Sequence, residues 1–306
     1  MPVQETPVLI VAGPTASGKS TAAAMLGRML GGEVINADSM QVYRDLRVLT
    51  ARPSAEEQVQ VRHHLYGHVD GSERYSVGRF VKETVPLIKA LWANGTVPIL
   101  CGGTGLYLQA LVDGLSHVPD VPEAFTAKGN ALWDEDPAAF RHAVLEHDPA
   151  MERLEAADRQ RHVRAWGVMQ ATGIPLSDWQ QRPREKLLRA DFYPSVLIPP
   201  REELYASCDA RLETMLNMGA EDEVRALMAR KLPMDLPVMK ALGVAEIAAM
   251  IRGDMARDEA LEQAAQETRR FAKRQMTWFR NQTEWPTFAS ADHLVESLAK
   301  KVMATR

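Results

Sequence analysis

The sequence predicts an α/β protein whose parallel β-sheet core is interrupted by an inserted all-helical domain. Short, unbroken apolar runs alternate with helical patterns near the N-terminus, as expected of strands buried on both faces of a parallel sheet. From about residue 118 to residue 190, no convincing strand pattern occurs. We therefore expect a first core part over residues 1–117, a helical insertion over 118–190 and a second core part over 191–306.

The first core part begins with a strand, a tight turn and a helix. The apolar run over residues 8–11 predicts the strand, and the Ala-rich pattern that begins at Lys19 predicts the helix. Gly31 follows that pattern, and glycine is common just past the C-terminus of a helix. Two further strands are predicted over residues 33–36 and 97–101.

The insertion contains one helix whose ends can be placed. Asp158 is the expected N-cap, residues 159–171 form the body, and a glycine ends the helix. A second helix is expected to begin at Asp148, with a proline in its first turn. After the insertion, residues 195–198 return to the sheet, and residues 200–285 are mostly helical by periodicity.

The composition is ordinary for a soluble globular protein, with 46% hydrophobic and 25% charged residues. Lys and Arg number 36 and Asp and Glu 40, so the formal charge is −4, which excludes a chain that is basic throughout but permits a local basic face. Cys101 and Cys208 lie far apart in the chain, so neither a disulfide framework nor a zinc cluster is expected. No apolar run reaches the roughly 18 to 20 residues of a membrane span, and we expect a cytoplasmic protein with no membrane partner.

The segment after the first strand fits the phosphate-binding pattern GxxxxGK[ST]. Its glycines let the backbone turn tightly, so that successive N–H groups and a helix N-terminus point at an oligophosphate. Lys19 adds a positive charge, and the Ser20 hydroxyl can ligate Mg²⁺. The flanking strand and helix favour this function over a turn that binds nothing, and they predict a core like that of the P-loop NTPases. The loop consists of Gly13, Pro14, Thr15, Ala16, Ser17, Gly18, Lys19 and Ser20.

Two other strand ends carry polar residues. Asp38 follows the second strand, at the edge of the sheet where ligands bind in open α/β folds. It could hold a metal through water or accept a proton, and the alternative is an N-cap for the next helix. Thr104 follows Gly102 and Gly103 after the third strand, where glycines permit close approach of a ligand or another backbone segment. The alternative there is a plain strand-to-helix turn.

Basic residues concentrate in two places. Each cluster by itself fits a solvated surface, but two clusters on an acidic chain favour RNA, because arginine binds phosphate and stacks on bases. The clusters are Arg159, Arg161 and Arg164 in the insertion, and Arg269, Arg270, Lys273, Arg274 and Arg280 near the C-terminus, the second interleaved with Trp278 and Phe279.

Taken in this order, the motifs resemble the tRNA dimethylallyltransferase family over nearly the whole chain. The matching segments are residues 13–20, 38–44, 102–107, 160–164, 223–225, 240–246 and 273–280. The resemblance implies transfer of a dimethylallyl group from dimethylallyl diphosphate to the exocyclic amine of the adenosine just 3′ of the anticodon in tRNA, with release of diphosphate. It also implies that the insertion grips the anticodon arm.

The resemblance assigns roles by position. Asp38 would be the general base on the adenine amine, and Thr104 would lie at the catalytic centre. The phosphate loop would bind the diphosphate, with Mg²⁺ on Ser20 and with help from Arg225. The residues expected to contact tRNA are Asp38, Ser39, Met40, Gln41, Gln160, Arg161, His162, Val163, Arg164, Lys240, Ala241, Leu242, Gly243, Val244, Ala245, Lys273, Arg274, Gln275, Met276, Thr277, Trp278, Phe279 and Arg280.

Three departures from the family pattern affect the expected RNA contact. Leu49 stands where the family usually has the glycine of Gly-Thr-Ala-Lys-Pro, and Val244-Ala245 stand where it usually has Tyr-Lys. A basic residue that some members carry near Phe125 is absent. These changes remove an aromatic group and positive charge from the RNA-facing surface but leave the residues of the reaction in place.

Two other functions fit part of the pattern. A small-molecule kinase would use the same loop and a nearby Asp, but it leaves the insertion and both Arg clusters unexplained. A non-catalytic NTP-dependent RNA-binding protein leaves Asp38 and Thr104 without a role. We expect a monomeric enzyme whose partners are tRNA and dimethylallyl diphosphate.

Overall fold

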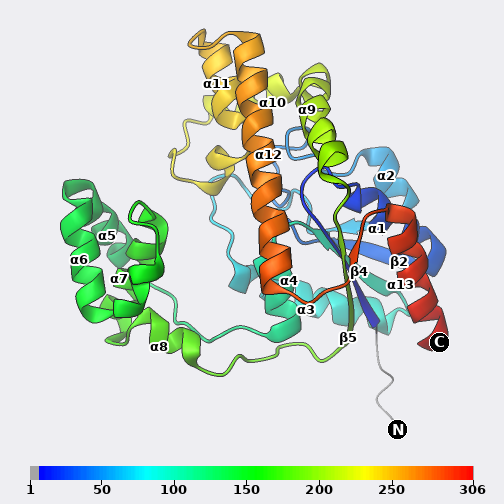
Figure 1. The fold of residues 1–306 in the computed structure, drawn as a ribbon, viewed down its shortest axis with the longest axis horizontal. Helices are drawn as coiled ribbons and strands as arrows, with labels where there is room; N and C mark the ends of the chain where they lie inside the picture. The colour runs from blue at the N-terminus through cyan, green and yellow to red at the C-terminus, as the bar shows by residue number, and fades with distance from the viewer. Residues whose placement is uncertain (1–6, 306) are drawn as a thin grey trace. The chain divides into compact units, whose positions relative to one another are not determined.

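The computed structural model describes residues 7–305 and confirms the predicted α/β fold (Figure 1). Its six-stranded sheet is parallel throughout, in the order β3-β2-β4-β1-β5-β6. The strands are β1 (Pro7–Ala12), β2 (Gly32–Asn36), β3 (His63–His64), β4 (Val97–Gly102), β5 (Asp191–Leu197) and β6 (Thr287–Phe288). The sequence did not predict β3 and β6, because two residues are too few to show a strand pattern.

The register brings three strand ends to one place. Ala12 pairs with Gly102, and Asn36 pairs with Cys101, so β1, β2 and β4 end at the same edge of the sheet. The phosphate loop, the segment with Asp38 and the Gly-Gly-Thr turn all leave the sheet at this edge. These three segments are therefore neighbours although they are up to about ninety residues apart in the chain.

Helices cover the sheet and extend beyond it. Helix α1 (Lys19–Leu30) packs against α13 (Ala291–Thr305), and both contact the sheet. The predicted end of α1 is confirmed, since its C-cap Gly31 is left-handed with φ of 64°. The other helices of this part are α2 (Ala55–Gln60), α3 (Val77–Ala93), α4 (Gly105–Asp113), α9 (Arg201–Asn217), α10 (Ala220–Ala229), the 3₁₀ helix η2 (Pro237–Lys240), α11 (Val244–Arg252) and α12 (Arg257–Gln282).

Helices α9 to α11, with Ala264 of α12, share an apolar core with the segment that follows Asp38. Val42 and Leu46 of that segment are buried against Val224 and Val244. Polar contacts fix the same arrangement, because the carboxylate of Glu223 accepts hydrogen bonds from the backbone N–H groups of residues 47–49 at 2.8 to 3.1 Å. The segment that follows Asp38 is thereby joined to α10 by both apolar and polar contacts.

Contacts divide the chain into two compact units, residues 1–112 with 188–306, and residues 113–187. Residues 1–6 and 306 lie outside the part that the structure describes. The predicted insertion bounds were 118 and 190. The helical unit starts before residue 118, because Leu115 pairs with Glu185 and Asp113 forms an ion pair with Arg184. It ends before residue 190, because the buried Leu188 belongs to the first unit.

The second unit is built from helices around its own apolar core. The core includes Trp133, Phe140 and Val168. The helices are α5 (Glu123–Glu135), α6 (Pro137–His147), the 3₁₀ helix η1 (Pro149–Arg153), α7 (Arg159–Thr172) and α8 (Leu176–Gln181).

Two helix starts were predicted in this unit, and both are confirmed. Asp158 caps α7 by accepting a hydrogen bond from the N–H of Arg161, and a left-handed Gly173 ends the helix. The helix expected from Asp148 begins there with a proline in its first turn, but it is a short 3₁₀ helix that ends at Arg153. The Asp148 carboxylate accepts from the N–H of Ser177 instead, so it ties this turn to α8. Within residues 7–305 there is no helix with the length and apolar character needed to cross a membrane.

Candidate active site

The phosphate loop connects β1 to α1, as predicted. Gly18 is the N-cap of α1 and has a φ of 85°, which a side chain would strain, so glycine is required there. A Cβ atom on Gly13 would lie 2.6 Å from the carbonyl oxygen of Leu197 on β5, so glycine is required there too. Because Gly18 has no side chain to cap α1, the first N–H groups of the helix remain available to an anion.

Distant residues hold the loop in shape. The N–H of Thr15 donates to Gln275 Oε1 on α12 at 2.8 Å, and the Thr15 hydroxyl accepts from Arg211 Nη1 on α9 at 2.8 Å. Lys19 Nζ donates to the carbonyl of Pro14 at 3.0 Å. The loop is thus fixed at its third residue by side chains from two helices of the second core part.

Asp38 is held by hydrogen bonds on both of its sides. Its N–H donates to Asn36 Oδ1 at 2.9 Å, and its own Oδ1 accepts from the N–H of Met40 at 2.9 Å. The alternative role as a helix N-cap is wrong, because turns follow Asp38 and the next helix starts only at Ala55. The Oδ1 oxygen of Asp38 therefore fixes the turn.

The Gly-Gly-Thr turn packs directly on the Asp38 segment. A Cβ atom on Gly102 would lie 2.1 Å from the carbonyl oxygen of Ala37, and one on Gly103 would lie 2.2 Å from Gln275 Nε2. The Thr104 hydroxyl accepts from the N–H of Ser39 at 2.9 Å. The close backbone approach predicted for these glycines is confirmed, and it brings Thr104 into contact with the neighbour of Asp38.

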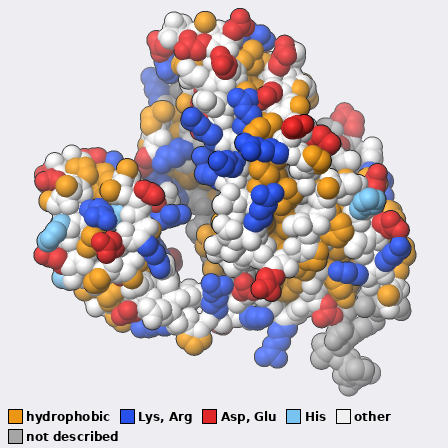
Figure 2. Space-filling view, viewed as in Figure 1, with side chains coloured by type: hydrophobic (Ala, Val, Ile, Leu, Met, Phe, Trp, Pro, Cys, Tyr) orange, Lys and Arg blue, Asp and Glu red, His pale blue; other side chains and the backbone are white. Residues whose placement is uncertain are grey.

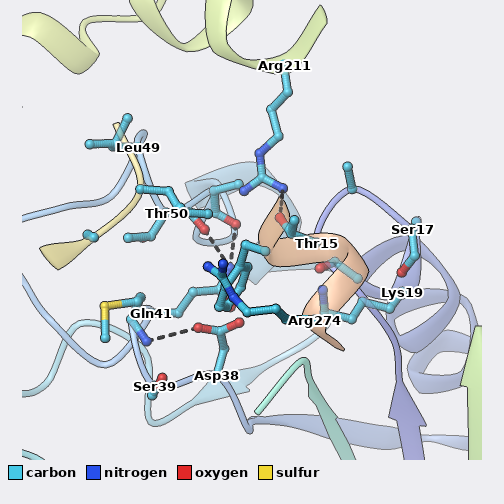
Figure 3. A pocket seen from close by; sticks show the side chains of 18 of the residues that line it. Thr15, Ser17, Lys19, Asp38, Ser39, Gln41, Leu49, Thr50, Arg211 and Arg274 are labelled. Atoms are coloured by element: carbon cyan, nitrogen blue, oxygen red, sulfur yellow. Dashed lines mark hydrogen bonds between the residues drawn. The ribbon is translucent and has the colours of Figure 1, made fainter. Parts of the chain in front are cut away.

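These segments enclose a cavity of about 320 Å³ within the first unit (Figure 3). It brings together much of the predicted phosphate loop, the whole segment from Asp38 to Gln41, and residues 240–242. Thr104 lies behind Ser39 and is not in the lining. The lining consists of Thr15, Ala16, Ser17, Gly18, Lys19, Ser20, Asp38, Ser39, Met40, Gln41, Leu49, Thr50, Ala51, Arg211, Lys240, Ala241, Leu242, Phe271 and Arg274.

The cavity places cations around a single carboxylate. Burial lowers the pKa of Lys19, and the nearby Asp38 opposes this shift. Burial likewise lowers the pKa of Arg211, again against the effect of Asp38. Beneath the loop, burial raises the pKa of the Cys101 thiol to about 11, so this cysteine is not a nucleophile at neutral pH. The site is therefore suited to bind an anion beside a carboxylate base.

Arg211 takes the position that was predicted for Arg225. Arg225 lies on the exposed face of α10, where it pairs with Glu221 at 2.7 Å, and it is not in the cavity lining. The inward residue of that segment is Glu223, which binds the backbone of residues 47–49. No local sequence signal identifies Arg211, because its contact with Thr15 spans 196 residues.

Some of the residues predicted to contact tRNA are buried, and others are exposed. Eight are buried, namely His162, Val163, Ala241, Gly243, Val244, Gln275, Met276 and Phe279, so their side chains, where they have one, are not exposed to a nucleic acid in this conformation. The exposed ones are Gln160, Arg161, Arg164, Lys240, Ala245, Lys273, Arg274, Thr277 and Arg280. Lys and Arg side chains gather over α12 in Figure 2, and Trp278 covers Gly105 at the start of α4.

Two of the departures from the family pattern, Leu49 and Val244, lie in one apolar core, whereas Phe125 lies on α5 of the helical unit. A Cβ atom on Gly243 would lie 3.0 Å from Leu49 Cδ1, and both Leu49 and Val244 belong to the same apolar core. Leu49 also lines the cavity, so this departure changes the wall of the site as well as its surroundings. Ala245 is exposed at the first turn of α11.

Comparisons with known proteins agree on one family. The IPP transferase family profile matches residues 41–282, and an isopentenyl transferase profile matches residues 6–69. A tRNA dimethylallyltransferase of Rhizobium etli is 50% identical over 279 residues, covering 90% of this chain and 94% of the relative. Another, of Phenylobacterium zucineum, is 48% identical over 292 residues, covering 94% of each chain.

Two solved structures are similar along most of the chain. A tRNA isopentenylpyrophosphate transferase from Bacillus halodurans has a TM-score of 0.69 at 30% identity, and the match covers 98% of this chain and 96% of that one. A eukaryotic dimethylallyltransferase acting on tRNA has a TM-score of 0.75 at 29% identity, with coverage of 90% and 70%.

Proposed function

The chain belongs to the IPP transferase family and is a prenyltransferase acting on tRNA, and we propose that its donor is dimethylallyl diphosphate. The acceptor is the exocyclic amine of the adenosine just 3′ of the anticodon, and the products are the prenylated tRNA and diphosphate. One observation carries this proposal, namely that the phosphate loop and Asp38 line the same cavity. An anion site and a base in one cavity are what an alkyl transfer from a diphosphate requires.

The reaction is difficult because the adenine amine is a poor nucleophile. Its lone pair is delocalised into the ring, so attack on the allylic carbon needs a base at nitrogen and stabilisation of the leaving diphosphate. The bond between nitrogen and the allylic carbon forms while the bond between that carbon and the diphosphate oxygen breaks. The amine proton passes to Asp38, and the electron pair of the breaking bond leaves with the diphosphate.

Asp38 is prepared for this role. Its Oδ1 is bound by the N–H of Met40, which orients the carboxylate, and its second oxygen can receive the proton. Thr104 supports it indirectly, because its hydroxyl holds the backbone of Ser39. Thr104 therefore acts at the catalytic centre by fixing the segment that carries the base.

The leaving diphosphate is matched by donors from both core parts. The N–H groups at the start of α1, Lys19 and Arg211 all face the cavity. Ser20 is exposed at the cavity wall and offers one hydroxyl ligand. Among the described residues there is no cluster of three or more His, Cys, Asp or Glu side chains that could hold a metal. An ion at Ser20 would therefore take most of its ligands from the diphosphate and from water, and these are oxygen ligands of the kind that Mg²⁺ prefers. When bound, Mg²⁺ would neutralise charge that develops on the leaving group.

The surface of α12 and the helical unit provide basic faces for tRNA. Arg274 is exposed and also lines the cavity. Its side chain can therefore contact the acceptor nucleotide where that nucleotide enters the cavity. Arg161 and Arg164 lie one turn apart on α7, and we assign to them the phosphates of the anticodon arm. Flipping a base costs a few kcal/mol in a duplex and less in a loop, which favours an anticodon-loop target. We place this reaction in the cytoplasm, carried out by a monomer.

The direct test follows two labels. The protein is incubated with unmodified tRNA and either dimethylallyl diphosphate labelled in the allylic group or γ-labelled ATP, with and without Mg²⁺. We expect only the allylic label to enter tRNA. Transfer of the γ-phosphate to tRNA or to a small molecule would identify a kinase instead, and binding of both substrates without transfer of either label would identify a non-catalytic RNA-binding protein.

A further inference from the structure

Gln275 joins two segments of the site from inside the protein. It lies on α12 with 6% of its surface exposed. Its Oε1 accepts from the N–H of Thr15 at 2.8 Å, and its Nε2 donates to the carbonyl of Gly103 at 3.0 Å. A single side chain thus bridges the phosphate loop and the Gly-Gly-Thr turn, which are 260 and 172 residues away from it in the chain.

The bridge continues to the base. Thr104 follows Gly103, and its hydroxyl accepts from the N–H of Ser39 at 2.9 Å, while its own N–H donates to the carbonyl of Ala37 at 3.2 Å. Residues 37 and 39 flank Asp38 on both sides. A continuous path of bonded residues therefore runs from the phosphate loop through Gln275 to the two neighbours of Asp38.

The packing around this path is tight. A Cβ atom on Gly103 would lie 2.2 Å from Gln275 Nε2, so the amide of Gln275 fills the space that a side chain at position 103 would need. Helix α12 is itself tied to α9 by the ion pair between Arg269 and Asp209, and α9 also supplies Arg211, which holds the hydroxyl of Thr15. The loop is therefore held at one residue by two helices that are joined to each other.

We propose that Gln275 is a positioning residue that sets the separation between the leaving diphosphate and the general base. This inference rests on the proposed function, because the separation matters only when both groups act on one transfer. The neutral amide carries an acceptor oxygen and a donor nitrogen side by side. The oxygen serves the N–H of Thr15, and the nitrogen serves the carbonyl of Gly103. Because the Thr15 N–H is already used by Gln275, the diphosphate is bound by the later N–H groups of the loop.

This role differs from tRNA contact. Lys273 and Arg274 point to the exposed face of the same helix, whereas Gln275 is buried and has both ends of its amide bonded inside the protein. One helix thus presents cations to the nucleic acid on one face and fixes the transfer geometry with the other. Loss of the amide should therefore affect the chemical step more than the binding of either substrate.

Two variants and one matched control test the proposal. Gln275→Met keeps the length and removes both hydrogen bonds, whereas Gln275→Glu keeps the acceptor and, when ionised, loses the donor. The control is Gln109→Met. Gln109 Nε2 donates to the carbonyl of Gln282 at 3.5 Å and so links α4 to α12, but neither residue lines the cavity.

We expect Gln275→Met to lower the single-turnover transfer rate roughly 10- to 100-fold, since a misplacement of about 1 Å can cost 10²-fold. The dissociation constants for dimethylallyl diphosphate and tRNA should stay within about threefold, because the groups that contact the substrates remain. Gln275→Glu should fall between Gln275→Met and the wild type, and Gln109→Met should match the wild type. An unchanged rate in Gln275→Met, or a loss confined to KM, would overturn the proposal.

A second readout does not depend on activity. Amide hydrogen exchange without substrates should be faster in Gln275→Met for peptides that cover residues 13–20 and 100–107, with α13 as an internal reference for global unfolding. If the wild type does not transfer the allylic group, the proposed function fails, and exchange still decides whether Gln275 holds the two segments. Equal exchange in Gln275→Met and Gln109→Met would refute the bridge. If Gln275→Met does not fold, the same comparison is made with Gln275→Glu.

Discussion

Two of the groups of residues that line the cavity are built in opposite ways. The phosphate loop supplies six consecutive residues, from Thr15 to Ser20, the last two of which form the start of α1. The second group comes from three separate places, with Arg211 on α9, residues 240–242 before α11, and Phe271 and Arg274 on α12 (Figure 3). The first group binds through local backbone geometry, whereas the second depends on how distant helices pack. The chemistry of the leaving group can therefore be encoded locally, but its alignment with the acceptor cannot.

The largest expected effect concerns Asp38, which lies between the two groups. Asp38→Asn keeps an acceptor for the N–H of Met40 but cannot take a proton at neutral pH. The single-turnover rate should fall by about 10² to 10⁴, with both substrate affinities close to normal. The acidic limb of the pH–rate profile, if it reports the ionisation of Asp38, should disappear as well. A loss smaller than about tenfold with intact affinities would make Asp38 a turn-fixing residue and place the base elsewhere.

The next test compares one cation from each group. Lys19→Ala and Arg211→Ala should each weaken dimethylallyl diphosphate binding about 10- to 100-fold, because each removes a charged partner of the diphosphate. Binding of tRNA should survive in both. The control is Arg225→Ala, which should change affinity less than about twofold, since its pairing with Glu221 is exposed. Equal losses in Arg211→Ala and Arg225→Ala would contradict the assignment of Arg211.

A smaller effect is expected on the helical unit. Replacing both Arg161 and Arg164 by Ala should raise the KM for tRNA by several-fold and make the slope of log affinity against log salt shallower by about 1.4, as two lost contacts to single-stranded phosphates would. The rate at saturating tRNA should change little. The matched control replaces Arg252 and Arg257, two exposed arginines of the first unit. The same salt slope in both double variants would show that α7 is a solvated surface.

The smallest effect is on stability. Asp158→Ala removes the side chain that caps α7 and should destabilise the helical unit by about 1 kcal/mol. Thermal unfolding of that unit should move down by a few degrees while diphosphate binding stays normal. Glu135→Ala, an exposed change in the same unit, serves as the control. A loss of diphosphate affinity in Asp158→Ala would show that the two units are energetically coupled.

The local parts of the site were predictable because consecutive residues carry them. The strand, the loop and the helix from residue 7 to residue 30 follow from one apolar run and one motif. The register of β1, β2 and β4 then places Asp38 beside the loop, as the position of Asp38 after a strand suggested. Glycines that allow close backbone approach at 102 and 103 were also identified correctly.

The rest required long-range packing. Arg211 and Gln275 reach the loop across 196 and 260 residues, and neither lies in a motif that marks a phosphate partner. Conversely, Arg225 was chosen from a matching segment, although α10 turns Glu223 inward and leaves Arg225 in solvent. The tRNA contact expected of the whole segment 273–280 stays a prediction, but Gln275, Met276 and Phe279 are buried, because a helix buries one face whichever motif it carries.

The pairing of Leu115 with Glu185 has a consequence for the history of such a chain. The insertion leaves and rejoins the core at adjacent points, so the ends left by its removal could be closed by a short turn. No strand of the sheet lies within it. A segment arranged in this way can be acquired, lengthened or exchanged by a single genetic event without breaking the sheet. The helical unit is therefore free to change without altering the strands that position the phosphate loop and Asp38.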